Sequence, residues 1–433
     1  METSGAFVLG DRRLSRQPAS LAVMSLIRNI CAAWATALVL ASCAQLPAKP
    51  QVVGGAKAPV LVLVSIDGFR ADYLDRGVTP NLSRLAAQGV HGAIRPSFPT
   101  KTFPNHYSLV TGLRPDRHGI IDNNMIDPEI PDVAFSLSNK AAVRDARWWN
   151  DGTPIWVSAE RAGIRSATMF WPGSEAAIQG VRPSLWLPFN QGMSATARVD
   201  QVLAWLDEPA ATRPRLVTLY FDEVDTAGHY FGPDSTQVAE AAGRTDMAIG
   251  RLTEGLKARG LKANLVIAAD HGMAAVAPDR VIFLEDLAAP DLGRARALGA
   301  FMTFYPAPGR EAEAEAALLA PHPHVTCWRK GEIPARYHFG THRRVAPIFC
   351  LPQTGWEIAR RGKRLPKGGN HGFDPYSPEM AAIFIGHGPA FARGRATPLT
   401  DNVDVYPLLA RLLGVAPEPN DGGPTLMDAA LAR

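Results

Sequence analysis

Three hydrophobic runs of this chain each lead into an acid, and two of those acids are accompanied by a histidine. The runs and the residues that follow them are Val60–Ile66 with Asp67, Leu216–Phe221 with Asp225 and His229, and 265–269 with Asp270 and His271. Continuous apolar runs are typical of strands buried on both faces of a parallel sheet. Ligands bind such sheets at the carboxyl ends of the strands. Because Asp and His together suit a divalent metal ion, the pattern predicts a metal site at one edge of one sheet.

A candidate nucleophile, Thr102, lies in the segment 97–107. Pro104 fits the first turn of a helix, which places Thr102 at the helix N-terminus, where backbone N–H groups favour an anion. A metal ion can turn a threonine hydroxyl into an effective nucleophile. Taken alone, Thr102 is more simply read as a helix cap. The predicted metal cluster nearby favours the nucleophile.

Length and composition describe a globular chain. Its 433 residues suggest one large or two modest domains, and 46% apolar against 20% charged residues allow a sizeable core. A formal charge of +4 is too small to indicate nucleic acid as a partner. The sequence shows no internal repeat.

The N-terminal 42 residues read as a leader and signal peptide. Translation starts at Met1 or Met24, and the apolar stretch 30–40 is too short for a transmembrane helix. The residues around Cys43 resemble a bacterial lipobox, which predicts an exported, periplasmic lipoprotein anchored to the membrane through Cys43; an ordinary secretory signal is the alternative. Residues 43–57 read as a flexible tether, and 58–433 as a single catalytic domain.

Two further cysteines, Cys327 and Cys350, follow the leader. An even pair in an exported chain suggests one disulfide. Two separate buried thiols remain the alternative.

Ordered motifs along the whole chain resemble the nucleotide pyrophosphatase/phosphodiesterase family of the alkaline phosphatase superfamily. The motifs are Ser65-Ile66-Asp67-Gly68-Phe69-Arg70, Thr79-Pro80-Asn81-Leu82, the Thr102 segment, Gly112-Leu113-Arg114-Pro115, Asp225-Thr226-Ala227-Gly228-His229, Asp270-His271-Gly272-Met273, Asn370-His371-Gly372-Phe373 and Asn402-Val403-Asp404-Val405-Tyr406. The resemblance implies zinc-dependent hydrolysis of phosphodiester and pyrophosphate bonds in small-molecule nucleotides. It also implies a covalent nucleotidyl-threonine intermediate and release of nucleoside 5'-monophosphates.

The resemblance assigns the site residues one by one. One zinc ion takes Asp67, Thr102, Asp270 and His271, and a second takes Asp225, His229 and His371. Asp222, at a spacing that also fits a helical face with His229, is the competing ligand. Asn123 resembles a residue that donates to a phosphate oxygen, with a turn asparagine as the alternative. Lys101 is expected to add positive charge around the same oxygens, with a solvated loop lysine as the alternative. Phe103 and Phe189 resemble two rings that sandwich a base, with core packing as the alternative for Phe189, and Asp374 is expected to orient structure or a ligand histidine.

Related enzymes remain open as alternatives. A phosphodiesterase for choline or lipid diesters and a phosphonoacetate hydrolase would use the same fold, whereas the sulfatase motif is missing from the nucleophile position. A catalytically silent binding lipoprotein is disfavoured because all seven ligand positions are filled.

The implied fold class is α/β: a three-layer α/β/α, alkaline phosphatase-like domain with a mainly parallel central sheet. Segments 130–200 and 285–365 are expected to decorate the active-site edge. Residues 311–320 and 403–413 are expected to be helices.

Overall fold

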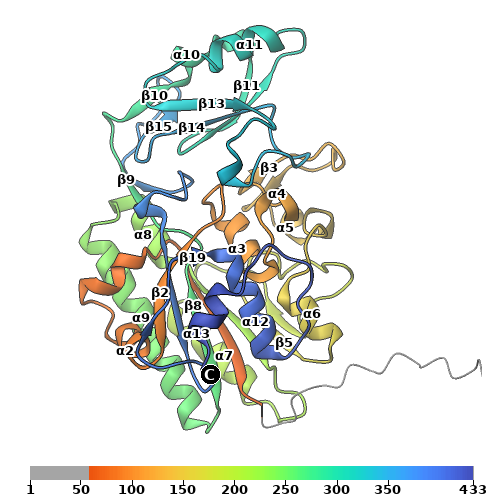
Figure 1. Ribbon diagram of the computed structural model, residues 1–433, viewed down its shortest axis with the longest axis vertical. Coiled ribbons are helices and arrows are strands. Elements are labelled where there is room, and N and C mark those ends of the chain that lie inside the picture. Colours follow the sequence, from red (N-terminus) through yellow and green to blue (C-terminus); the bar gives the residue numbers. More distant parts are fainter. Residues whose placement is uncertain (1–57, 433) are drawn as a thin grey trace, which may run out of the picture. The chain divides into compact units, whose positions relative to one another are not determined.

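A mixed sheet of nine strands forms the centre of the computed structural model, which describes residues 58–432 (Figure 1). Eight strands follow the order β18-β2-β17-β8-β1-β7-β5-β6, and β19 pairs with β2. They span Val60–Ile66 (β1), Val90–Arg95 (β2), Ser166–Met169 (β5), Leu185–Leu187 (β6), Leu216–Phe221 (β7), Ala263–Ala268 (β8), Ala382–His387 (β17), Arg395–Ala396 (β18) and Thr400–Asp401 (β19). Within this sheet only β17 runs against the others, so the expected mainly parallel sheet is confirmed. The predicted leader (1–42) and tether (43–57) lie outside the described residues.

The three predicted apolar runs are the three central strands. Strand β1 is buried along its whole length and lies between β7 and β8, with Ser65 opposite both Tyr220 and Ala268. All three strands therefore end at the same edge of the sheet, as parallel strands in register must.

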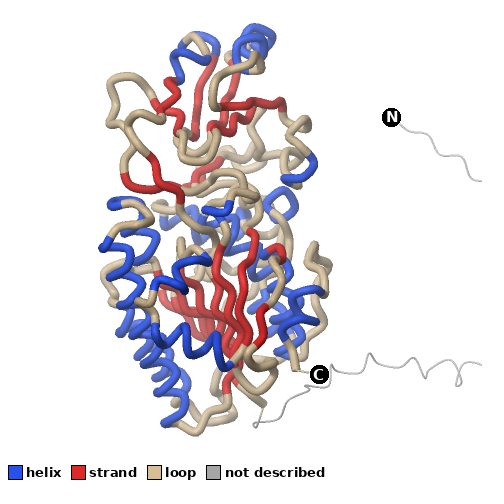
Figure 2. The backbone as a smooth tube through the Cα atoms, turned by 60° about the vertical axis from the view of Figure 1, so that its left-hand side comes forward, coloured by secondary structure: helices blue, strands red, loops and turns tan. Residues whose placement is uncertain are grey.

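Helices cover both faces of the sheet (Figure 2). On one face α9 packs against α2, α7 and α8, and on the other α12 packs against α3, α6 and α13. Their bounds are Pro80–Gln88 (α2), Thr102–Thr111 (α3), Ile155–Arg161 (α6), Ala195–Leu206 (α7), Glu223–Phe231 (α8), Thr236–Ala258 (α9), Val405–Leu413 (α12) and Thr425–Ala430 (α13). The three-layer arrangement is therefore as predicted. The expected helix over 403–413 begins as a 3₁₀ turn, Asn402–Asp404, and continues as α12.

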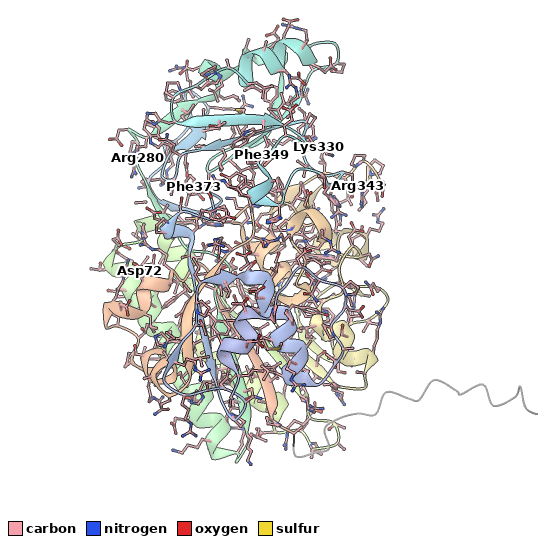
Figure 3. All side chains as sticks on the ribbon, viewed as in Figure 1. Asp72, Arg280, Lys330, Arg343, Phe349 and Phe373 are labelled. Atoms are coloured by element: carbon pink, nitrogen blue, oxygen red, sulfur yellow. A yellow bond between two sulfur atoms is a disulfide. The ribbon has the colours of Figure 1, made fainter. Side chains whose placement is uncertain are left out.

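A second, four-stranded sheet has an apolar core of its own, in the order β11-β12-β14-β13. Its strands are Gly293–Ala297 (β11), Met302–Pro306 (β12), Val325–Arg329 (β13) and Ile348–Pro352 (β14), and helix α11 spans Glu311–Leu318. Cys327 and Cys350 lie opposite each other on β13 and β14 and are joined by a disulfide, which decides between the two alternatives. Phe349 of β14 packs its ring 5.1 Å from that of Phe301 and 5.4 Å from that of Phe98 (Figure 3).

One segment that was expected to lie only at the active-site edge, 130–200, belongs partly to the central sheet. The segment 130–200 contributes β5 and β6, whose lengths of four and three residues are too short to show a strand period in the sequence. The remaining short elements are Asn124–Met125 (β3), Phe135–Ser136 (β4), Ala274–Val276 (β9), Val281–Phe283 (β10), Glu357–Ala359 (β15), Gly368–Asn370 (β16), Pro115–His118 (α4), Lys140–Arg144 (α5) and Leu284–Leu287 (α10). Within residues 58–432, no helix has both the length and the apolar character needed to cross a membrane.

Candidate active site

The seven predicted metal ligands gather at the carboxyl edge of the central strands. Asp67 directly follows β1, and Asp270 and His271 follow β8. Thr102 is the first residue of α3, Asp225 and His229 lie on α8, and His371 directly follows β16. Segments from the two halves of the sequence thus meet at one place.

The first predicted ligand group surrounds one ring nitrogen. His271 Nε2 lies 2.9 Å from an Asp270 carboxylate oxygen and 3.4 Å from Asp67 Oδ1. Thr102 Oγ1 lies 3.3 Å from the same nitrogen. One ion could therefore be reached by all four side chains.

The second group centres on Asp225. Its Oδ2 lies 3.4 Å from His229 Nε2, and its Oδ1 lies 3.6 Å from His371 Nε2. The rings of His271 and His371 stack with centres 3.6 Å apart, which joins the two groups.

Backbone carbonyls fix the orientation of all three ligand histidines. Nδ1 of His271 lies 2.9 Å from Gly272 O, that of His371 lies 2.8 Å from Thr100 O, and that of His229 lies 3.0 Å from Gly369 O. Since a carbonyl can only accept, Nδ1 carries the proton and Nε2 keeps its lone pair for the site. This is the arrangement in which proteins present histidine to a metal ion.

The carboxylate groups of the site are incompletely hydrogen-bonded within the described residues. Asp67 Oδ1 and Asp225 Oδ1 are buried and accept no hydrogen bond from any residue in 58–432. Burial, and then the nearby carboxylates Asp270 and Asp225, raise the pKa of Asp67 well above its ordinary value. Burial, and then the approach of His271, lower the pKa of His371 and keep its ring neutral. Buried carboxylate oxygens without a donor, beside imidazoles whose Nε2 atoms face the site, fit one or two divalent cations.

A glycine brings two of the carboxylates close together. Gly68 has φ +67°, and a Cβ there would lie 3.0 Å from the Cα of Asp225. Its N–H donates to Asp270 Oδ1 over 3.2 Å. A residue with a side chain at this position would push α8 away from β1.

Two supporting residues were not assigned a role from the sequence. The hydroxyl of Tyr220 donates to Asp67 Oδ2 over 2.6 Å. His106 places Nδ1 2.8 Å from the Thr102 carbonyl and Nε2 2.8 Å from Ser65 Oγ, and it also approaches Asp270 at 3.3 Å. Because protein atoms engage both of its ring nitrogens, His106 positions Thr102 and Asp270. Its place four residues after Thr102, one turn along α3, was the available signal.

The structure separates Asp222 from the metal ligands. Arg198 Nη1 lies 2.7 Å from Asp222 Oδ1, and Gln191 donates to Asp222 Oδ2 over 3.1 Å. Asp222 therefore already has a cationic partner. Asp374 accepts from Arg336 and Tyr337 and so holds the local fold, whereas no described contact links it to a ligand histidine.

The groups next to Thr102 have defined surroundings. Asn123 Oδ1 accepts from the Phe103 N–H over 2.9 Å, which leaves its NH₂ group as a donor. Lys101 is half-buried, with Nζ 5.5 Å from the Phe301 ring centre, and burial lowers its pKa. Lys101 is thus not a solvated loop lysine.

An aromatic cavity of about 400 Å³ opens beside Asp67 and Thr102. Phe103 and Phe189 both line it. Phe103 is half-buried against Phe135 and Trp149, with ring centres 5.8 and 6.0 Å away, while Phe189 is 41% exposed. Core packing therefore does not account for Phe189.

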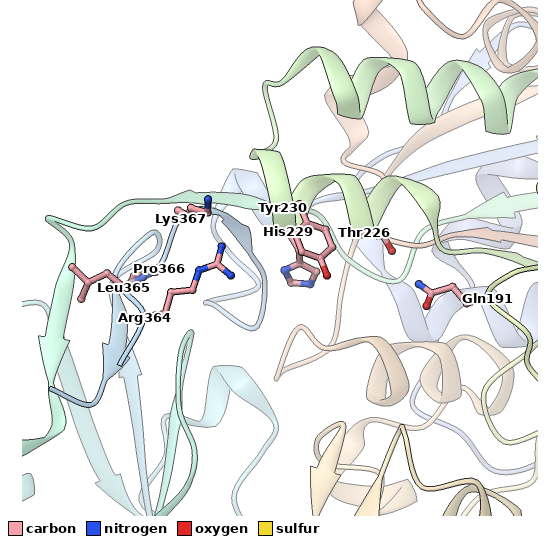
Figure 4. A pocket seen from close by; sticks show the side chains of 8 residues that line it. All are labelled: Gln191, Thr226, His229, Tyr230, Arg364, Leu365, Pro366 and Lys367. Carbon is pink, nitrogen blue, oxygen red and sulfur yellow. The ribbon is translucent and has the colours of Figure 1, made fainter. Parts of the chain in front are cut away.

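A second cavity, of about 510 Å³, lies on the other side of the site (Figure 4). His229 and Thr226 border it from α8, and Arg364 and Lys367 border it from the loop before β16. Gln191 lines both cavities. The candidate site thus has an aromatic side and a basic side.

Comparison with known proteins gives consistent matches. The family model described as type I phosphodiesterase/nucleotide pyrophosphatase matches residues 61–374. Bovine ectonucleotide pyrophosphatase/phosphodiesterase family member 3 is 39% identical over 86% of this chain and 44% of its own length. A venom phosphodiesterase of Naja atra is 39% identical over 84% of this chain and 45% of its own, so the chain spans less than half of these relatives. An uncharacterized pyrophosphatase/phosphodiesterase of Schizosaccharomyces pombe is 37% identical over 84% of this chain and 78% of its own.

Two solved structures match this chain over nearly the whole of their own length. Human ectonucleotide pyrophosphatase/phosphodiesterase 5 is 34% identical with a TM-score of 0.81, covering 86% of this chain and 99% of its own. An inactive murine counterpart, carrying a threonine-to-alanine change and bound to AMP, is 35% identical with a TM-score of 0.82, covering 87% and 100%.

Proposed function

The chain belongs to the type I phosphodiesterase/nucleotide pyrophosphatase family, and we propose that it hydrolyses phosphodiester and pyrophosphate bonds of nucleotides with two zinc ions. The proposal rests above all on Thr102 Oγ1, which lies 3.3 Å from His271 Nε2 at the N-terminus of α3. The donors of the site, carboxylate oxygens and imidazole nitrogens, are the ones that zinc takes. Bound zinc would supply a positive charge that stabilises an ionised hydroxyl and the charge developing on phosphate oxygens.

In the proposed reaction Thr102 is first the nucleophile at phosphorus and then the leaving group. Its Oγ gives up a proton to solvent and forms a bond to the phosphorus of the nucleotide. The bond to the leaving oxygen breaks, and that oxygen keeps the electron pair and takes up a proton. Water then attacks the nucleotidyl-threonine, releases the nucleoside 5'-monophosphate and restores Thr102. Two displacements at one site give net retention at phosphorus.

Neighbouring groups of the chain would stabilise the phosphate. The NH₂ of Asn123 is held in place by the hydrogen bond that its Oδ1 accepts from the Phe103 N–H, so it can donate to a phosphate oxygen without reorganising. His106 steadies the first turn of α3 through the Thr102 carbonyl.

The aromatic cavity would take the nucleoside. Phe103 and Phe189 offer ring surface on its walls, and the murine neighbour bound to AMP shows that this fold accommodates a nucleoside monophosphate in that protein. The inactivity of its threonine-to-alanine variant supports a threonine nucleophile here.

The basic cavity would take the leaving group of a nucleoside polyphosphate. Arg364 and Lys367 face it beside His229 (Figure 4). A pyrophosphate leaving group carries several negative charges, and these two cations would complement them.

Export and lipid attachment at Cys43 belong to the same proposal. A periplasmic, membrane-anchored enzyme would act on nucleotides outside the cytoplasm.

Replacement of the nucleophile tests the proposal. Thr102→Ala should lower kcat for a nucleoside monophosphate p-nitrophenyl ester on the order of 10⁴-fold or more, because the covalent route is removed. Metal content should stay unchanged, since the six carboxylate and imidazole ligands remain, and Thr102→Ser should keep partial activity. Near-normal turnover by a folded, metal-loaded Thr102→Ala variant would exclude Thr102 as the nucleophile.

A further inference from the structure

Cationic side chains precede the central strands at the edge of the sheet opposite the active site. Arg165, Arg215 and Lys262 each stand one residue before a parallel strand, namely β5, β7 and β8. Asp225 and Asp270 of the candidate site follow the far ends of β7 and β8. The two ends of the sheet therefore carry opposite charge.

Two of these cations, Arg215 and Lys262, line a cavity of about 400 Å³, here called the basal pocket. Arg213, Arg215, Arg259 and Lys262 line it, together with Ala58, the first described residue.

The charge of the basal pocket is only partly balanced. Arg259 is paired with Asp207 through two contacts of 2.7 Å. Within residues 58–432, Arg213, Arg215 and Lys262 form no ion pair; Arg213 donates instead to the backbone carbonyl of Glu208. Arg215 Nε and Nη1 are buried, and no residue in 58–432 accepts from them. Buried guanidinium donors without an acceptor call for an anion, and a phosphate fits their planar fork best.

The position of the basal pocket indicates where that phosphate comes from. Ala58 lines the pocket, and the cysteine predicted to carry lipid, Cys43, stands 15 residues before it in the sequence. A chain of that length can span at most about 50 Å, so a lipid on Cys43 would keep this end of the sheet near a bilayer. Clusters of Lys and Arg near a membrane attract anionic headgroups.

We propose that the basal pocket binds the phosphate of an anionic phospholipid headgroup. The amino ends of β1, β7 and β8 would then face the membrane surface. Strand β1 has seven residues, so the active site would lie at least about 23 Å further out and open away from the bilayer. This inference rests on the proposed lipid at Cys43 but not on the proposed catalysis, which the experiment below therefore does not test.

Protection of Lys262 tests the inference. The full-length chain is reconstituted into vesicles of phosphatidylcholine alone or of an equimolar mixture with phosphatidylglycerol. Amine acylation is then followed by peptide mass spectrometry. Phosphatidylglycerol should slow acylation of Lys262 about fivefold or more, the effect expected of one basic residue at an anionic surface. Lys140, which lines the aromatic cavity, should react equally in both vesicles.

Variants separate the basal pocket from simple nearness to the membrane. Arg213→Gln/Arg215→Gln should abolish the protection of Lys262, whereas the matched pair Arg294→Gln/Arg296→Gln on β11 should keep it. Both variants should hydrolyse the chromogenic diester normally, which shows that they fold. If the double variant at the pocket does not fold, Arg213→Gln alone should weaken the protection.

Three results would overturn the inference. Equal acylation of Lys262 in both vesicles would mean that no headgroup binds there. Equal protection by millimolar inorganic phosphate in neutral vesicles would identify a site for small anions. Protection that survives Arg213→Gln/Arg215→Gln would attribute the effect to the tether alone.

Discussion

Phe189→Ala tests the assignment of the aromatic cavity to the nucleotide base. Phe189 is 41% exposed, and among the described aromatic rings it has two neighbours, Phe170 and Tyr220, with ring centres 5.4 and 6.1 Å away. Removing it should therefore cost the fold little, whereas Phe103 is half-buried and its loss would leave a gap beside Trp149. Base–aromatic stacking contributes about 1–3 kcal/mol, so kcat/KM for a nucleotide diester should fall roughly 5- to 150-fold.

The assay compares two chromogenic diesters, one carrying a nucleoside and the other a methyl group in its place. Phe189→Ala should impair cleavage of thymidine monophosphate p-nitrophenyl ester and leave methyl p-nitrophenyl phosphate nearly unaffected. Leu137→Ala is the matched control, because Leu137 lines the same cavity and is 48% exposed but carries no ring. Equal losses on both diesters, or equal effects of the two variants, would refute the stacking argument.

Three further predictions concern the metal, the buried core and the leaving group. His371→Ala should lose one of two zinc ions, and finding both by elemental analysis would show that the ligand grouping is wrong. Burial lowers the pKa of His118 to about 3, below its unfolded value of about 6.5, so its contribution to stability should be complete above about pH 6.5 and decline as the pH falls toward 3. Urea unfolding at about pH 7 and pH 5 should therefore show a smaller pH dependence of stability in His118→Gln than in the wild type. An equal pH dependence in the two proteins would contradict this role of His118. Arg364→Gln/Lys367→Gln should lower kcat/KM for ATP roughly tenfold while sparing p-nitrophenyl diesters, whereas Lys363→Gln, outside the cavity, should change neither.

The sequence allowed the fold and the position of the candidate metal site to be predicted because both follow from strand ends. Strands β1 and β8 are uninterrupted apolar runs, and residues that follow adjacent parallel strands must meet. The alkaline phosphatase-like α/β fold is confirmed on this basis and by the likeness to solved structures. His371 is different, because it follows a strand of only three residues and was placed through the resemblance alone.

Contacts that depend on register could not be predicted. Tyr220 reaches Asp67 because β1 and β7 pair with Ser65 opposite Tyr220, and the sequence does not state that offset. The strands β5 and β6 were missed because a few residues show no period. Likewise, the sequence left the role of Phe189 open, because its exposure depends on the loop that carries it.

Asp222 and Asp225 lie three residues apart at the start of α8, but only Asp225 belongs to the candidate metal site. Helical spacing from His229 fits both, so periodicity could not separate them. What separates them is Arg198 on α7, which approaches Asp222 to 2.7 Å and neutralises it. Asp225 instead approaches the imidazoles of His229 and His371, and within residues 58–432 it forms no ion pair with an arginine or lysine. Leaving a carboxylate uncompensated is unfavourable for the bare chain, so the arrangement is stable where a cation from outside completes it. The position of the protein's own arginine therefore decides which acid remains free for a metal ion.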